Sequence, residues 1–200
     1  SISPTFDAGG KYLYFLASTD FGPKTSWLEM SSIDHPVRRS AYLVILRSGE
    51  ASPFLPVAGD EPVKPAAGEA PKPKPAAADD SVRIDLNGIR ERTLAVSVPA
   101  ADYNKLVAGP AETFFFSESV PAIGGLRLQK YSIKAETAVP FLEGIAQYSV
   151  SADKKKLLYG ARGGRWGVIG TEAPAKVGDG PLNVAQLEMK IDPRAEWADI

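Results

Sequence analysis

Near its start the chain carries Phe6-Asp7-Ala8-Gly9-Gly10-Lys11-Tyr12-Leu13-Tyr14-Phe15, and the same pattern returns as Val150-Ser151-Ala152-Asp153-Lys154-Lys155-Lys156-Leu157-Leu158-Tyr159. Each copy has an apolar residue, a small polar turn, a lysine and then a strand-like run that ends in an aromatic residue. Antiparallel sheets built by repetition show this pattern, and such a repeat determines the whole fold. The repetition therefore predicts a stack of similar sheets, an arrangement that serves scaffolds and binding surfaces more often than catalysis.

Turn signals recur about every 8 to 12 residues and separate short apolar runs, as in all-β proteins. The runs at 11–17 and 41–47 are predicted strands, and Phe114-Phe115-Phe116 is predicted to be the centre of a buried strand. No long amphipathic helix pattern interrupts them. With one insertion set aside, the two copies are about three modules of roughly 40 to 45 residues apart, the length of a propeller blade. The sequence predicts an all-β fold, a partial β-propeller of about three four-stranded antiparallel blades.

Complete propellers have about four to eight blades, so we expect the chain to be a piece of a larger ring. Residues 1–56 are predicted to form the first blade and 82–192 the further blades, with 193–200 a junction to a following domain. The stretch 57–81 is rich in Ala, Pro and Lys, which predicts a flexible insertion because it offers little to bury. A docking peptide at this stretch is the alternative.

Local signals carry finer predictions. They are a short edge strand at 52–55, a hairpin at Asn87-Gly88 between runs at 82–86 and 93–99, a turn at Gly144, and a closing strand at 182–191.

Composition excludes several classes of function. Lys and Arg total 23 against 24 Asp and Glu, so no strong field favours nucleic acid or membranes as partners. No apolar run is long enough for membrane insertion. The chain has no Cys and a single His, His35, next to Asp34. Neighbouring residues on an extended chain point apart, so no catalytic triad assembles from this pair. We therefore predict no catalytic residue, no metal site and no cofactor.

One stretch has a composition that suggests ligand binding, and it is Arg162-Gly163-Gly164-Arg165-Trp166. Arginine forks match carboxylates and an indole offers a stacking face, so Arg162, Arg165 and Trp166 are candidates for binding a peptide carboxylate or a carbohydrate. The alternative is structural. Two glycines supply positive φ for a tight turn, the arginines are solvated, and the Trp packs between blades.

Three phrases carry a family resemblance. Residues Val82-Arg83-Ile84-Asp85-Leu86-Asn87-Gly88-Ile89-Arg90-Glu91-Arg92, followed by Val98-Pro99-Ala100-Ala101-Asp102-Tyr103, resemble the propeller segment of tricorn-type serine peptidases. The opening 3–15 is similar to blades of the same propellers. The phrase Met189-Lys190-Ile191-Asp192-Pro193-Arg194-Ala195-Glu196-Trp197 is similar to the junction where these peptidases leave the propeller.

The resemblance implies a function and partners. Propellers of this family precede a PDZ-like module and an α/β catalytic core, and none of the core's motifs occurs here. The chain would then be the non-catalytic segment that guides or filters peptide substrates and supports assembly, while the parent protein is a serine-type peptidase. Its partners would be the parent's catalytic and PDZ-like domains and peptide substrates. Bacterial members suggest a periplasmic or secreted location, with the cytoplasm as the alternative.

Two further expectations stay beside this one. A propeller that binds a protein or a glycan, unrelated to proteolysis, is the alternative function. An incomplete propeller also exposes sheet edges that can pair with another chain, so we expect self-association of the isolated chain.

Overall fold

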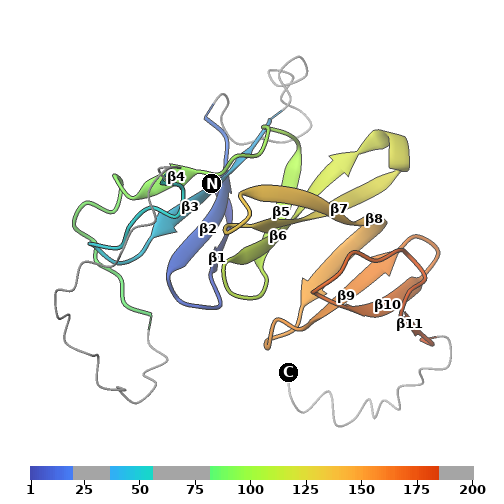
Figure 1. The fold of residues 1–200 in the computed structure, drawn as a ribbon. Coiled ribbons are helices and arrows are strands. Elements are labelled where there is room, and N and C mark those ends of the chain that lie inside the picture. The colour runs from blue at the N-terminus through green and yellow to red at the C-terminus, as the bar shows by residue number, and fades with distance from the viewer. Residues whose placement is uncertain (20–36, 56–81, 185–200) are drawn as a thin grey trace, which may run out of the picture.

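A computed structural model describes residues 1–19, 37–55 and 82–184 and shows two antiparallel sheets (Figure 1). The first sheet has the order β1-β2-β3-β4, and the second has the order β11-β10-β9-β8-β7-β6-β5. Among the described residues the sole helical element is a 3-10 turn, η2 (Pro121–Ile123). The strands are β1 (Ile2–Phe6), β2 (Tyr12–Ala17), β3 (Ser40–Ile45), β4 (Thr93–Ala95), β5 (Tyr103–Ala108), β6 (Thr113–Val120), β7 (Gly125–Ser132), β8 (Thr137–Val150), β9 (Lys156–Ala161), β10 (Arg165–Gly170) and β11 (Pro181–Leu182). The predicted all-β fold is confirmed.

Strand β8 divides the second sheet into two blades. Its first half pairs with β7 and its second half pairs with β9, while Ile145 has partners on both sides. The middle blade is therefore β5, β6, β7 and the start of β8, and the third blade is the end of β8 with β9, β10 and β11. With the first sheet, these make the three four-stranded blades that the repeat predicts.

The predicted turn at Gly144 is wrong, because β8 continues through it (Figure 1). Gly144 has a φ of 77°, and the register with both neighbouring strands shifts close to it. Irregularities of this kind bend a strand without ending it. A bent strand lets one segment leave the middle blade and enter the third.

The first blade extends across the predicted domain division. Strand β4 pairs with β3 and completes the first sheet, although its residues lie in the stretch 82–192 that was assigned to the further blades. A division of the chain by sequence order cannot assign a fourth strand to the first blade when a long connection separates that strand from the other three. The insertion 57–81 and the junction 193–200 lie outside the described residues.

Two more local predictions are wrong. Residues 52–55 form a turn and not an edge strand, and Asn87-Gly88 lies in a run of turns and not in a hairpin. Of the predicted closing strand at 182–191, only Leu182 lies in a strand, β11, since residues 183 and 184 are not part of a strand. Residues 185–191 lie outside the described residues. His35 lies outside them as well.

The repeated sequence forms repeated turns. The Gly10 amide donates to the Asp7 carbonyl at 3.0 Å, and the Lys154 amide donates to the Ser151 carbonyl at 3.0 Å. Gly10 and Lys154, which correspond in the two copies, both have positive φ, at 67° and 61°. Glu112 has the same conformation in the first hairpin of the middle blade, with a φ of 60°. All three blades thus begin with a similar turn.

Two apolar clusters join the three blades. Phe114 and Phe116 belong to the cluster shared with the first blade, and Phe115 belongs to the cluster shared with the third. Side chains alternate between the two faces of a strand, so three consecutive phenylalanines serve both interfaces. Each of them is 0% exposed, which confirms the predicted buried strand centre.

The end blades use opposite faces of the same repeat. The first blade packs on the middle blade through Tyr12 and Tyr14, whereas the third packs on it through Leu157 and Tyr159. In the repeat, Leu157 and Tyr159 correspond to Leu13 and Phe15, not to the tyrosine pair. The first and third blades lie on opposite sides of the middle blade, so equivalent blades must turn opposite faces towards it.

The reversal leaves one apolar face at each end, and we call these the end faces. On the first blade the end face carries Leu13, Phe15 and Tyr42, with the last two rings stacked at 5.4 Å. On the third blade it carries Leu158, Trp166 and Val168. Within the described part of the chain, neither end face packs on another sheet.

Asp7 connects the first and middle blades through hydrogen bonds. Its carboxylate accepts from the Gly9 amide at 2.9 Å, from the Tyr14 hydroxyl at 3.1 Å and from the Glu112 amide at 2.8 Å. Asp7 is only 4% exposed, and burial beside this carboxylate raises the pKa of the Tyr14 hydroxyl far above its ordinary value. A buried carboxylate with three donors ties the first turn of one blade to that of the next.

Replacing Asp7 by alanine is expected to destabilise the chain by about 2–4 kcal/mol, because buried donors lose their acceptor. The measurement is urea unfolding followed by far-ultraviolet circular dichroism. Asp153→Ala is the matched control, because the Asp153 carboxylate also accepts from a turn residue, at 3.1 Å from the Lys155 amide, but is exposed. Equal losses for the two variants would contradict a special role for Asp7.

Candidate functional site

The phrase that carries the family resemblance folds into a loop. The guanidinium of Arg92 donates to the carbonyls of Ile45 at 3.0 Å and Asn87 at 2.7 Å, and also to the carbonyl of Asp85. The Asp85 carboxylate accepts from the Ser48 amide and hydroxyl, both at 2.9 Å. Asp85 and Arg92 therefore hold the stretch 82–92 against the end of β3, which is why it does not form the predicted hairpin.

These hydrogen bonds lower the pKa of Asp85 below its ordinary value of 3.8, and the largest cause is the Ser48 amide. A carboxylate with a lowered folded pKa stabilises the fold above the unfolded pKa, and this contribution is lost as pH falls through the folded pKa. The motif residue Asp85 thus has a structural role.

Asp85→Asn is expected to reduce stability most at neutral pH, and the deficit should shrink as pH falls below about 4, where the wild-type carboxylate becomes protonated. Unfolding midpoints between about pH 7 and pH 3 measure this, with Asp102→Asn as the control. Asp102 is also on a surface connection, and its side chain is 56% exposed with a 3.9 Å ion pair. A deficit that does not change with pH would contradict the assignment.

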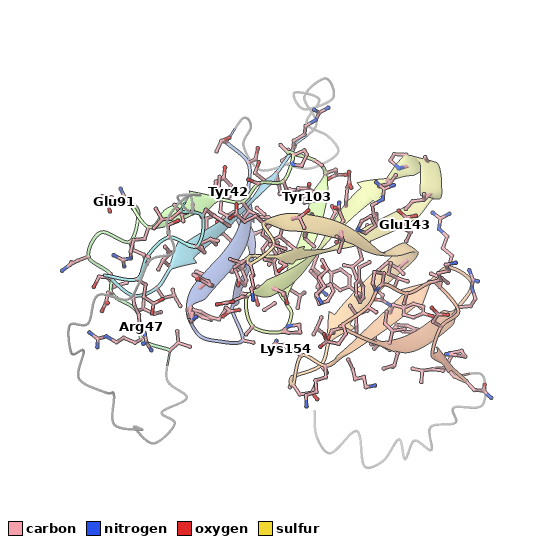
Figure 2. All side chains as sticks on the ribbon, viewed as in Figure 1. Tyr42, Arg47, Glu91, Tyr103, Glu143 and Lys154 are labelled. Atoms are coloured by element: carbon pink, nitrogen blue, oxygen red, sulfur yellow. The ribbon has the colours of Figure 1, made fainter. Side chains whose placement is uncertain are left out.

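The second family phrase ends in Tyr103, which is labelled in Figure 2 on β5. Its hydroxyl donates to the Pro99 carbonyl at 2.7 Å, and its ring meets the Phe116 ring edge-on at 4.9 Å. Burial raises the pKa of Tyr103 to about 12. This phrase stabilises the connection between the first and middle blades, whereas the first phrase holds a loop within the first blade.

The arginine–glycine turn joins β9 to β10. Gly163 and Gly164 have φ of 76° and 70°, so the turn requires glycine as expected. Arg165 pairs with Ala161, and Trp166 pairs with Gly160, so the two side chains point to opposite faces of the blade. Indole atoms of Trp166 lie 3.2 Å from where a Cβ of Gly160 would be. The predicted binding residues are therefore neighbours in sequence but do not converge.

Arg162 lines a cleft. The cleft has a volume of about 410 Å³ and lies between the β6–β7 turn, residues 119–126, and Ile145, Ala146 and Arg162 of the third blade. The Arg162 Nη1 atom lies 3.3 Å from where a Cβ of Gly124 would be. Sequence reasoning missed the opposite wall, since nothing in the pattern at 119–126 indicates that this turn lies beside Arg162.

A second cleft of about 210 Å³ lies between Pro140–Glu143 of β8 and residues 174–177. The Ala175 amide donates to the Phe141 carbonyl at 2.9 Å across it. The cleft is small and already bridged by backbone, so it offers little room for a ligand.

No metal-binding group of three or more His, Cys, Asp or Glu residues occurs within residues 1–19, 37–55 and 82–184. Over the same ranges, no helix has the length and apolar character needed to cross a membrane.

Comparison with known proteins places this fold. No family model matches the chain. The tricorn protease homolog of Saccharolobus solfataricus is 26% identical over 167 residues, which cover 78% of this chain and 14% of that protein. Tricorn protease homolog 1 of Streptomyces coelicolor is 24% identical over a stretch covering 98% of this chain and 20% of that protein. The crystal structure of the tricorn protease is similar with a TM-score of 0.55 and 17% identity, over 90% of this chain and 17% of that one.

The chain is similar to a propeller segment of the tricorn proteases. The sequence matches extend through the loop 82–92 and the connection to Tyr103, and the structural match covers all three blades in large part. The segment spans about a fifth or less of the length of these curated relatives. Of the three phrases that carry the resemblance, the one at 189–197 lies outside the described residues.

Proposed function

We propose that this tricorn-type segment is the non-catalytic propeller portion of a larger serine peptidase. In that protein it guides or filters peptide substrates and supports assembly with catalytic and PDZ-like domains. The similarity to tricorn protease homologs over most of the chain supports this proposal, as does the small share of those proteins that the chain covers. The observation that carries it is the pair of end faces, since a scaffold with an apolar face at each end requires neighbours.

The end faces support an assembly role through their composition. Phe15, Tyr42 and Trp166 are half-buried, and Leu182, the partner of Trp166 on β11, is 43% exposed. The core-facing counterparts of these residues, Tyr14 and Tyr159, are almost fully buried by the middle blade. Repetition implies that further blades of the same kind cover the end faces in the parent protein.

Guidance of peptides is tested in the full-length parent protein. The double variant Arg162→Glu/Arg165→Glu is expected to lower kcat/KM for unfolded casein severalfold, because the charge of this turn is reversed, while hydrolysis of a short chromogenic peptide is unchanged. The matched control is Arg38→Glu/Arg90→Glu, at two exposed arginines of the first blade.

An equal loss on both substrates would show damage to the catalytic part, and an unchanged casein rate would overturn guidance. Casein hydrolysis by the purified 200-residue chain, abolished by a serine-directed inhibitor, would overturn the non-catalytic assignment.

Self-association of the isolated chain is the expected consequence of its end faces. Multi-angle light scattering should show a mass that rises with concentration, and Trp166→Glu should shift the chain towards the monomer, since a charge on the third blade's end face opposes apolar contact. Val139→Glu is the control, because Val139 is 42% exposed on the outer strand of the middle blade, away from the end faces. A wild-type monomer at all concentrations would contradict this prediction.

A further inference from the structure

We propose that the cleft between the β6–β7 turn and Arg162 is a subsite for the C-terminal carboxylate of an extended peptide. Arg162 would bind the carboxylate and Ser119 would donate a second hydrogen bond, while apolar walls hold the last side chain. The inference rests on the proposed function, because it takes a peptide as the ligand. The sequence predicted three binding residues on one turn. The proposed subsite keeps only Arg162 of these and adds the β6–β7 turn of the middle blade as the opposite wall of the cleft.

Arg162 has the chemistry and the freedom for this role. Its guanidinium lies over Gly124, which has no side chain, and Arg162 and Gly124 both line the cleft. Among the described residues no carboxylate forms an ion pair with it, and no hydrogen bond from its side chain is found. A planar guanidinium presents paired N–H donors that match the two oxygens of a carboxylate.

Another arginine of the second sheet shows the contrast. Arg127, on β7, is neutralised from two sides, because its Nε lies 2.7 Å from a Glu143 oxygen and its Nη1 lies 3.8 Å from a Glu118 oxygen. Figure 2 shows Glu143 on the side of the molecule formed by the second sheet. The cleft itself has no acidic residue in its lining. Of the two arginines, Arg162 is the one whose charge is available to a ligand.

Ser119 supplies a second polar group on the opposite wall. Its Oγ accepts a hydrogen bond from the Asn104 amide at 3.0 Å, so its own hydrogen is available to a ligand oxygen. Asn104 lies on β5 and also donates to the Asp102 carbonyl at 3.3 Å, which fixes the orientation of the amide. Ser119 is thus oriented by the inner strand of the middle blade.

The rest of the lining suits a peptide better than a polyanion. Val120, Pro121, Leu126 and Ile145 provide apolar walls, and Ile145 is the point where the cleft meets the buried cluster between the blades. A single arginine matches a single negative charge, and the chain's net charge of -1 offers no field for nucleic acid. A volume of about 410 Å³ accommodates a terminal residue and its neighbour, not a folded domain.

The test is nuclear magnetic resonance titration of the full chain with two probes. One is N-acetyl-Ala-Ala-Phe with a free carboxylate, and the other is the same peptide as its C-terminal amide. We expect the carboxylate peptide to shift the amide signals of Gly124, Gly125 and Ala146, and to bind at least about tenfold more tightly than the amide, the usual effect of a hydrogen bond between charged groups.

Variants assign the effect to the cleft. Arg162→Gln should weaken carboxylate binding about tenfold, Arg162→Lys should restore part of it, and Ser119→Ala should weaken it severalfold. Arg90→Gln is the matched control, with the same change of charge at an exposed position on the first blade. Dispersed spectra of each variant show that the fold is retained.

Three results would overturn the proposal. They are equal affinity for carboxylate and amide peptides, equal weakening by Arg162→Gln and Arg90→Gln, and equal weakening by Arg162→Gln and Arg165→Gln, which would assign binding to the exposed turn. The experiments distinguish failure of the carboxylate subsite from failure of the proposed guiding function. If the parent protein loses casein hydrolysis in the turn variants while the chain binds neither probe, the subsite falls and guidance stands.

Discussion

The middle blade, with apolar residues on both of its faces, is the constraint on which the rest of the structure depends. A single strand places Phe114 and Phe116 against the first blade and Phe115 against the third, all fully buried. Removing large aromatic side chains from such positions costs about 3–5 kcal/mol each, a large share of the stability of a domain. The two interfaces therefore cannot vary independently, because adjacent residues of one strand serve both.

Hydrogen bonding adds orientation to this packing. Asp7 ties the first turns of two blades, and a reciprocal pair of contacts links the inner strands of the next two. Lys105 Nζ donates to the Tyr148 carbonyl at 2.8 Å, while the Tyr148 hydroxyl donates to the Lys105 carbonyl at 2.9 Å. Apolar contact alone tolerates sliding, whereas directional hydrogen bonds fix the register of one sheet against the next. The cleft beside Arg162 depends on this fixed placement, because its walls come from the middle blade and the third blade.

The residues that carry the family resemblance and the residues proposed to bind peptide are different sets. Asp85, Arg92 and Tyr103 carry the resemblance, and each holds a loop or a connection in place. Without these side chains, backbone carbonyls and amides of the loop and the connection would lack partners. Arg162 belongs to a turn whose glycines are required by positive φ, but the arginine itself is not required by the turn. The family resemblance thus rests on residues that hold the scaffold, whereas the proposed binding residue lies on a turn.

The sequence by itself determined the all-β class, the repeat and the number of blades, because strand alternation and turn chemistry are local properties. It also indicated the arginine–glycine turn. Tertiary structure alone decided that β4 joins the first sheet, that β8 bends through Gly144 instead of turning, and that the 82–92 stretch closes as a loop. Tertiary structure also placed Trp166 and Arg165 on opposite faces of the third blade, and it placed the β6–β7 turn beside Arg162. These outcomes depend on contacts between residues distant in sequence, whose geometry no local pattern contains.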